Sequence, residues 1–158
     1  MQGEDRPNLY LTGFMGSGKT SVGRHLAQRL KYQFMDSDAE IAKKAQKSIT
    51  EIFNTEGEEA FRKWEKWFAE KGHPTEEMVV ATGGGMVTHD CIGNTLKQNG
   101  HVYVLCASPE HVYERTCRHS HRPLLNVEKP LDRIRELMRE REKYYREAGI
   151  QIMTDNRP

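Results

Sequence analysis

The chain has 158 residues, of which 36% are hydrophobic and 30% are charged, and its mean hydropathy is −0.81. A polar chain of this length can bury one hydrophobic core, so we expect one soluble domain over residues 1–158. Lys and Arg number 24 against 23 Asp and Glu, a net charge of +1 that excludes the excess needed to bind bulk nucleic acid; no apolar run is long enough for a membrane span.

The strongest motif follows a predicted strand at residues 8–12. Residues 13–20 have the sequence Gly-Phe-Met-Gly-Ser-Gly-Lys-Thr, a complete G-x-x-x-x-G-K-[S/T] loop that binds phosphate. A helix is predicted next from an apolar repeat at Val22, Leu26 and Leu30. The backbone N–H groups of such a loop surround phosphate oxygens, and the helix dipole favours the same negative charge. We expect Lys19 to reach the β- and γ-phosphates of a nucleotide and Thr20 to ligate Mg²⁺.

A short second strand is predicted at residues 32–35, and two aspartates follow it at Asp36 and Asp38. Loops at the carboxyl ends of strands in open α/β sheets face the ligand crevice. Two carboxylates there can divide the work, one near Mg²⁺ and the other beside an acceptor hydroxyl. The alternative is an ordinary helix N-cap, since Asp is favoured at that position.

Residues 48–51, Ser-Ile-Thr-Glu, have the form of a capping box. A helix is predicted at residues 58–71, with one apolar face formed by Phe61, Trp64 and Phe68. Arg62 and Glu65 are three residues apart on this helix, close enough for an ion pair. Such a pair is common on protein surfaces, so it indicates a site only together with other features.

Strands are predicted at residues 78–81 and 101–106, and Ser108-Pro109 predicts the start of a helix. The first of these strands is followed by Gly83, Gly84 and Gly85. Three consecutive glycines suggest backbone that passes tightly beside a ligand, although a plain flexible turn is the alternative.

The helical pattern lapses after residue 116. We expect residues 117–128 to form a loop long enough to be a lid, and a helix over residues 130–148 and a last strand at residues 151–154 to follow. Three potential metal ligands alternate at Cys117, His119 and His121, but their spacing fits a polar loop better than a zinc site. Most charges between residues 110 and 147 alternate in sign and are expected to lie on a solvated helix face.

Strands that alternate with amphipathic helices predict an α/β domain with a parallel sheet. The three cysteines, Cys91, Cys106 and Cys117, are odd in number and include no C-x-x-C pair. They therefore suggest neither a disulfide framework nor a zinc ribbon. With no signal peptide evident at the start of the chain, a reducing, cytoplasmic location is expected.

Together and in this order, these segments resemble shikimate kinase over nearly all of residues 8–158. The matching segments are the phosphate loop, Asp36-Ser37-Asp38, Ser48-Ile49-Thr50-Glu51-Ile52-Phe53, Phe61-Arg62-x-x-Glu65, Gly83-Gly84-Gly85, Arg122-Pro123-Leu124-Leu125 and Leu137-Met138-x-x-Arg141-x-x-x-Tyr145. The resemblance implies a three-layer fold like that of the nucleoside monophosphate kinases, with a five-stranded parallel sheet of order 2-3-1-4-5, flanking helices and a mobile lid. It also implies ATP-dependent phosphorylation of shikimate to shikimate 3-phosphate in the aromatic amino acid (chorismate) pathway.

The resemblance further implies an acceptor site that includes the helical segment at about residues 38–71. Asp38 would orient or deprotonate the attacking hydroxyl of shikimate. Arg62 and Arg141 would bracket the substrate carboxylate, which suits the planar fork of guanidinium. The remaining substrate contacts implied are Glu65, the backbone of Gly83, Gly84 and Gly85, and an apolar wall of Phe53 and Phe61.

On the nucleotide side, the resemblance implies that Asp36 holds Mg²⁺ through water. Arg115 resembles the arginine that stacks on adenine, and Arg122 would swing in with the lid to neutralise the transferred phosphoryl group. The nucleotide-binding set implied is Gly13, Gly16, Ser17, Gly18, Lys19, Thr20, Ser21, Arg115, Arg122 and Arg157. Positive groups gathered at one site explain how a chain of net charge +1 can bind two anions.

The chain differs from the family pattern in one respect, and two alternative functions are considered. The family usually has one more helix after the segment that ends here at Pro158, so we expect either a truncated or a naturally short chain. One rival is a kinase of another small polyol acid, such as gluconate, on the same fold. A non-catalytic nucleotide-binding module is the other, and the presence of Asp38, Arg62, Arg122 and Arg141 gives it little support. A monomer is expected.

Overall fold

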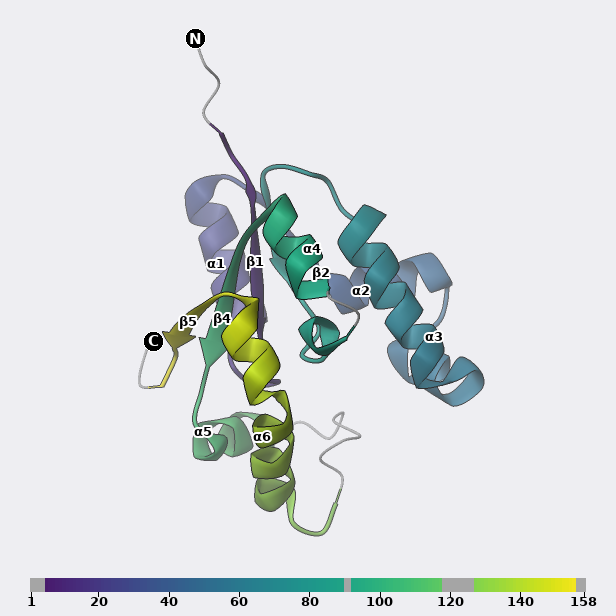
Figure 1. The fold of residues 1–158 in the computed structure, drawn as a ribbon, viewed down its shortest axis with the longest axis vertical. Coiled ribbons are helices and arrows are strands. Elements are labelled where there is room, and N and C mark those ends of the chain that lie inside the picture. Colours follow the sequence, from purple (N-terminus) through teal and green to yellow (C-terminus); the bar gives the residue numbers. More distant parts are fainter. Residues whose placement is uncertain (1–4, 90–91, 118–126, 156–158) are drawn as a thin grey trace.

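The computed structural model describes residues 5–89, 92–117 and 127–155. Five parallel strands form one sheet in the order β2-β3-β1-β4-β5, as predicted (Figure 1). The strands are β1 (Asn8–Gly13), β2 (Gln33–Asp36), β3 (Met78–Ala81), β4 (Gly100–Cys106) and β5 (Ile150–Met153). The predictions for β2 and β5 were displaced by one residue. Because all strands are parallel, their carboxyl ends meet at one edge, which positions the loops that follow them.

The helices are α1 (Lys19–Leu30), α2 (Ser37–Ala45), α3 (Ile49–Lys71), α4 (Ile92–Asn99), α5 (Pro109–Thr116) and α6 (Pro130–Ala148), with a short 3₁₀ helix, η1 (Met86–Thr88). The Ser48 hydroxyl caps α3 by accepting from the Glu51 N–H at 3.0 Å, and Ser108 caps α5. Gly57 interrupts α3 with φ 88°, so the helix predicted at residues 58–71 is the part beyond this kink. The capping serines, and the proline in the first turn of α5, thus set where these helices begin.

The core lies on both faces of the sheet. Alternate residues of β1 face opposite sides, because successive side chains of a strand point to opposite faces. Leu11 packs with Ala27 of α1 and Val79 of β3 on one side. On the other side, Tyr10 joins the larger cluster that includes residues of α3, α4 and α6. This is the three-layer arrangement that the family resemblance implies, with α4 and α6 in front of the sheet and α1 behind it (Figure 1).

The apolar repeat predicts α1 correctly as a helix, but of its three residues only Leu26 packs against the core. Val22 and Leu30 remain 38% and 39% exposed, whereas Gly23 and Ala27 are buried. Small side chains allow the helix to approach the sheet closely, so side-chain size rather than hydrophobicity alone decides which face packs.

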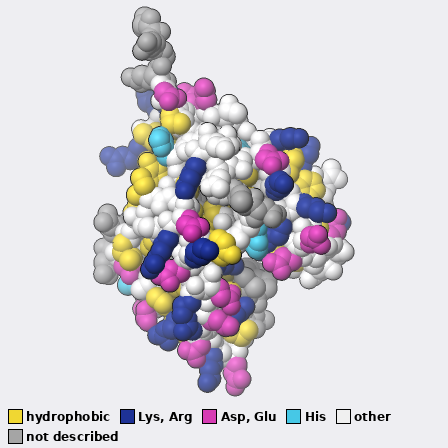
Figure 2. Space-filling view, in the orientation of Figure 1, with side chains coloured by type: hydrophobic (Ala, Val, Ile, Leu, Met, Phe, Trp, Pro, Cys, Tyr) yellow, Lys and Arg dark blue, Asp and Glu magenta, His cyan; other side chains and the backbone are white. Residues whose placement is uncertain are grey.

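On the face shown in Figure 2, Lys and Arg side chains lie interspersed with Asp and Glu side chains. On α6, Arg133 pairs with Glu136 at 2.9 Å and Arg146 pairs with Glu142 at 2.5 Å. None of the helices described is long and apolar enough to cross a bilayer. Cys106 and Cys117 are free thiols, whereas Cys91 lies outside the described residues.

Candidate functional site

The phosphate loop connects the carboxyl end of β1 to the amino end of α1. Gly13, Gly16 and Gly18 have φ angles of 140°, 76° and 99°, values that strongly favour glycine. An added Cβ at Gly13 would lie 2.3 Å from the Leu105 carbonyl oxygen, so the loop also needs glycine for its close approach to β4. The loop therefore has both the backbone conformation and the helix N-terminus required of a phosphate-binding cradle.

Lys19 and Ser17 each provide a polar side-chain group at this loop. The Lys19 ammonium donates to the carbonyl oxygens of Gly13 at 2.7 Å and Phe14 at 3.1 Å, which holds its positive charge over the loop. Ser17 is fully buried, and within the described part of the chain its hydroxyl oxygen has no hydrogen-bond partner. Thr20 and Ser21 lie exposed in the first turn of α1. Positive charge and an available buried hydroxyl at one helix N-terminus suit an anionic ligand.

Arg115 and Thr154 attach two distant segments to the phosphate loop. The Arg115 guanidinium donates to the Gly16 carbonyl oxygen at 2.9 Å and to the Thr154 carbonyl oxygen at 3.4 Å. The Thr154 hydroxyl donates to the Ser17 carbonyl oxygen at 3.1 Å. Arg115 thus lies at the nucleotide side as predicted, while Thr154 is a contact that sequence reasoning missed. Arg122, Arg157, His119 and His121 lie outside the described residues.

The three glycines after β3 each lie against a different charged side chain. An added Cβ at Gly83 would be 2.8 Å from Asp38 Oδ1, one at Gly84 would be 3.4 Å from Arg141 Nη1, and one at Gly85 would be 3.0 Å from Arg62 Nη1. A Cβ at Gly83 or Gly85 would therefore press on Asp38 or Arg62, whereas one at Gly84 would be in ordinary van der Waals contact with Arg141. This run is more than a flexible turn, because it brings three predicted acceptor-site side chains together from α2, α3 and α6.

Asp36 and Ser37 fix the start of α2 beside this run. Asp36 Oδ1 accepts from the Ala39 N–H at 3.1 Å, so the N-cap alternative is observed. The Ser37 hydroxyl accepts from the Gly83 N–H at 2.9 Å and is buried. These two bonds hold the first turn of α2, and with it Asp38, next to the glycines. A capping role uses one carboxylate oxygen of Asp36 and is compatible with a metal-bound water at the other.

Arg62 and Glu65 form the predicted ion pair, and Glu58 also contacts Arg62 at 3.2 Å. The Glu65 side chain is almost wholly buried, and burial raises the pKa of Glu65 to about 7 although Arg62 opposes this shift. Among the described residues, Glu65 Oε2 and Arg62 Nε are buried without a hydrogen-bond partner. A buried pair with spare polar atoms differs from the surface pair that the spacing alone allowed.

Aromatic rings lie beside the two arginines. The rings of Phe53 and Phe61 are 4.9 Å apart, and Phe61 is buried while Phe53 is 39% exposed. The guanidinium of Arg62 lies 5.5 Å from the centre of the Phe61 ring, and that of Arg141 lies 5.5 Å from the centre of the Phe14 ring. Phe14 is a further contact that the sequence did not single out. These rings give the cations an apolar side, where charge interactions are stronger than in open water.

Tyr145 is another residue for which the sequence gave no role. Its hydroxyl donates to the Gly84 carbonyl oxygen, and its side chain is buried on α6 one turn after Arg141. Its signals in the sequence were its place in the family-like segment that ends at Tyr145 and its four-residue spacing from Arg141, which places both side chains on one helix face.

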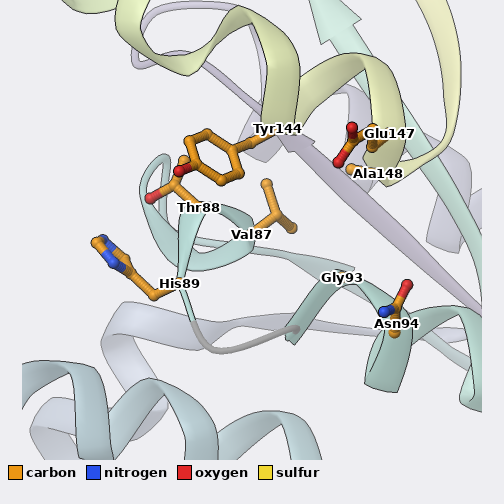
Figure 3. A pocket seen from close by; sticks show the side chains of 8 residues that line it. All are labelled: Val87, Thr88, His89, Gly93, Asn94, Tyr144, Glu147 and Ala148. Carbon is orange, nitrogen blue, oxygen red and sulfur yellow. The ribbon is translucent and has the colours of Figure 1, made fainter.

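A separate surface cavity of about 350 Å³ lies between η1, α4 and α6 (Figure 3). Its lining residues are Val87, Thr88, His89, Gly93, Asn94, Tyr144, Glu147 and Ala148. None of them is a predicted site residue. Thr88 nevertheless connects it to the glycine run, because its hydroxyl donates to the Gly85 carbonyl oxygen at 2.6 Å.

The geometry thus combines a phosphate cradle with a second cluster of two arginines and an aspartate. Gly84 joins the two, since an added Cβ there would lie 3.4 Å from both Arg141 Nη1 and the Gly13 carbonyl oxygen. Such an arrangement can hold a nucleotide phosphate next to an anionic molecule that carries a hydroxyl group.

Comparisons with known proteins agree with this geometry. The family model described as shikimate kinase matches residues 15–158. A shikimate kinase of Deinococcus radiodurans is 45% identical over 148 residues, 94% of this chain and 75% of that protein. The solved structure of a shikimate kinase from Acinetobacter baumannii in complex with shikimate has a TM-score of 0.89 and 43% identity, and covers 97% of this chain and 86% of that one. A gluconokinase from Sinorhizobium meliloti is 18% identical with a TM-score of 0.62, over 96% of this chain and 84% of its own, a likeness of fold alone.

Proposed function

This chain belongs to the shikimate kinase family and phosphorylates shikimate with ATP, and we propose that Asp38, Arg62 and Arg141 form its acceptor site. The product is shikimate 3-phosphate, in the aromatic amino acid pathway. The observation that carries the site assignment is the contact of Gly83, Gly84 and Gly85 with three charged side chains, which come from three different helices.

Asp38 orients the attacking hydroxyl group of shikimate and accepts its proton. A carboxylate at the carboxyl end of a parallel strand, next to the phosphate cradle, has the chemistry and the place for this role. Ser37 supports it, because its bond to the Gly83 N–H fixes the turn that carries Asp38.

Arg62 and Arg141 bind the substrate carboxylate from two sides. The planar guanidinium group can donate two parallel N–H bonds to a carboxylate, a geometry that an ammonium group lacks. Glu65 holds Arg62 through their ion pair, while Phe53 and Phe61 give the ring of the substrate an apolar wall. The backbone of the three glycines closes over the same ring.

On the donor side, Lys19 and the loop N–H groups stabilise charge on the transferred phosphoryl group. The residues assigned to the nucleotide are Gly13, Gly16, Ser17, Gly18, Lys19, Thr20, Ser21, Arg115 and Arg157. The lid at residues 117–128 excludes water, a competing acceptor, and carries Arg122 to the phosphoryl group. The support for this lid is the loss of helical pattern after residue 116 and the segment Arg122-Pro123-Leu124-Leu125, which resembles the family.

The donor set fits a magnesium ion. Thr20 supplies a hydroxyl at the first turn of α1, and Asp36 supplies a carboxylate with one oxygen used for capping. Among the described residues no group of three or more His, Cys, Asp or Glu could hold a metal ion, which suits Mg²⁺ bound mainly by nucleotide phosphates and water. Held by Thr20 and, through water, by Asp36, the ion would neutralise negative charge on the nucleotide phosphates.

The proposal also covers the setting of the enzyme. One domain over residues 1–158 acts as a monomer in the cytoplasm, with ATP and shikimate as its partners and without nucleic acid or membrane. The net charge of +1 leaves no excess for binding nucleic acid, and the phosphate loop and the proposed acceptor residues all come from this one chain.

The test is ADP release measured with Mg-ATP and shikimate, gluconate or no acceptor. Release that depends on shikimate and exceeds release with gluconate is expected. Lys19→Ala should abolish it, which controls for a contaminating kinase. Release that is equal with all three would favour a nucleotide switch, and release with gluconate alone would favour the polyol acid kinase.

A further inference from the structure

Tyr145 makes a buried polar contact between distant parts of the molecule. It lies on α6, is 9% exposed and donates its hydroxyl hydrogen to the carbonyl oxygen of Gly84. The roles proposed above do not use it. A phenylalanine would fill nearly the same space, so packing alone does not account for the hydroxyl.

The Gly84 peptide, which Tyr145 holds, lies between the phosphate loop and the acceptor-site residues. An added Cβ at Gly84 would be 3.4 Å from Arg141 Nη1, 3.4 Å from the Gly13 carbonyl oxygen and 3.7 Å from the Met15 nitrogen. Arg141 also lies over the ring of Phe14, a residue of the phosphate loop. A shift of Gly84 would therefore change the position of Arg141 and of the phosphate loop.

The positive charge of Arg141 also acts on Tyr145, which lies one turn further along the same face of α6. Burial raises the pKa of Tyr145, and the hydrogen bond and charge of Arg141 only partly offset that effect. The hydroxyl consequently stays protonated at neutral pH. While it donates to Gly84, its oxygen keeps lone pairs that can accept a hydrogen bond from a guanidinium group such as that of Arg141.

We propose that Tyr145 is a positioning residue of this kinase, whose hydroxyl holds the Arg141 guanidinium at a fixed distance from the Gly84 peptide. Through this contact it sets how the substrate carboxylate is presented to the phosphate loop. The inference rests on the proposed function, because Arg141 is assigned to the carboxylate there. Tyr145 touches neither substrate in this proposal and acts through Arg141 and Gly84.

The primary test compares Tyr145→Phe with Tyr144→Phe. Both variants remove one hydroxyl from adjacent positions of α6, but Tyr144 is 43% exposed and lines the separate cavity (Figure 3). Tyr145→Phe should raise the KM for shikimate about five- to tenfold, as expected for losing one buried hydrogen bond, and change the KM for ATP less than about twofold. Tyr144→Phe should leave both constants unchanged.

A double-mutant cycle then asks whether Tyr145 acts through Arg141. If it does, adding Tyr145→Phe to Arg141→Lys should raise the KM for shikimate much less than it does in the wild type. Full multiplication of the two effects would overturn the proposal. The dissociation constant for shikimate, measured by calorimetry without ATP, should follow the same pattern as the KM.

Melting temperatures separate positioning from a purely structural role. A lower melting temperature for Tyr145→Phe with both KM values unchanged would overturn the proposal, as would equal increases in both. Wild-type enzyme without shikimate-dependent ADP release would overturn the proposed function as well, so the two failures are distinguishable.

Discussion

Polar side chains are buried at both ends of the sheet, but the two ends differ in whether these side chains have hydrogen-bond partners. At the amino end, Asn8 donates to the Pro74 carbonyl oxygen at 2.7 Å and to the Tyr10 hydroxyl at 3.2 Å, and accepts from the Met78 N–H at 3.0 Å. The Tyr10 hydroxyl lies 2.7 Å from His73 Nε2. Every member of this group is paired within the protein.

At the carboxyl end, by contrast, several buried polar atoms have no partner in the described part of the chain. They are Thr12 Oγ1, Ser17 Oγ, Arg62 Nε and Glu65 Oε2. Leaving a buried polar atom unpaired costs about 1–3 kcal/mol, so such atoms mark places where a ligand or water completes the bonding. One end of the sheet therefore stabilises the fold, while the other gives up stability for substrate binding.

The largest effect should come from Asp38, at the binding end. Asp38→Asn keeps the size of the side chain but removes its charge and its ability to accept a proton, so kcat should fall about 10²- to 10⁴-fold. The measurement is kcat for ADP release at saturating ATP and shikimate. Asp132→Asn, on the exposed face of α6, is the matched control. A near-normal kcat for Asp38→Asn would remove Asp38 from catalysis.

Arg141 should show the next largest effect. Arg141→Ala removes charged hydrogen bonds to the substrate carboxylate, so the KM for shikimate should rise about 10- to 100-fold. The KM for ATP should change much less. Arg139→Ala, an exposed position on the same helix, controls for the general loss of positive charge. Equal changes in both KM values would point to a structural role for Arg141.

The features that could be predicted from the sequence are those whose signals are local. The glycine loop, the Ser48 and Ser108 caps and the Arg62–Glu65 spacing each identify a structure within a few residues. α4 was not predicted, because Gly93 and Asn94 weaken its helical pattern and few of its residues are buried.

The remaining features depend on tertiary contacts between distant residues. The spacing of Arg62 and Glu65 indicates an ion pair, but only the packed structure shows that Glu65 is buried. Similarly, the contact of Tyr145 with Gly84 joins residues 61 apart in the chain. Asn8, Tyr10 and His73 also have no local pattern, so a single sequence gives no signal for the group at the amino end of the sheet.

The pH dependence of substrate binding should show a smaller effect, through Glu65. When the shikimate carboxylate pairs with Arg62, it competes with Glu65 for the same cation and adds negative charge nearby. Both changes raise the pKa of Glu65 further above about 7, so binding takes up a proton. The dissociation constant for shikimate should therefore increase a few-fold between pH 6 and pH 8. Calorimetry in buffers of different ionisation enthalpy measures the proton uptake directly.

Glu65→Gln tests the source of this proton. The variant cannot ionise but can still accept a hydrogen bond from Arg62. It should bind shikimate with little dependence on pH in the same range. A dependence that persists unchanged in Glu65→Gln would assign the proton to another group.

The smallest effect should appear at the amino end, in stability rather than activity. The Phe68 carbonyl oxygen, 2.8 Å from His73 Nδ1, can only accept, so Nδ1 carries the proton and Nε2 accepts from the Tyr10 hydroxyl. Burial lowers the pKa of His73. The unfolded chain then binds more protons than the folded protein as pH falls below about 6.5, so the free energy of unfolding should decrease from pH 7 to pH 5. Denaturant unfolding should show that His73→Gln reduces this pH dependence, whereas His101→Gln, at an exposed position, should not. Since this group is remote from the substrates, His73→Gln should leave both KM values unchanged; a change in either would mean that the two ends of the sheet are coupled.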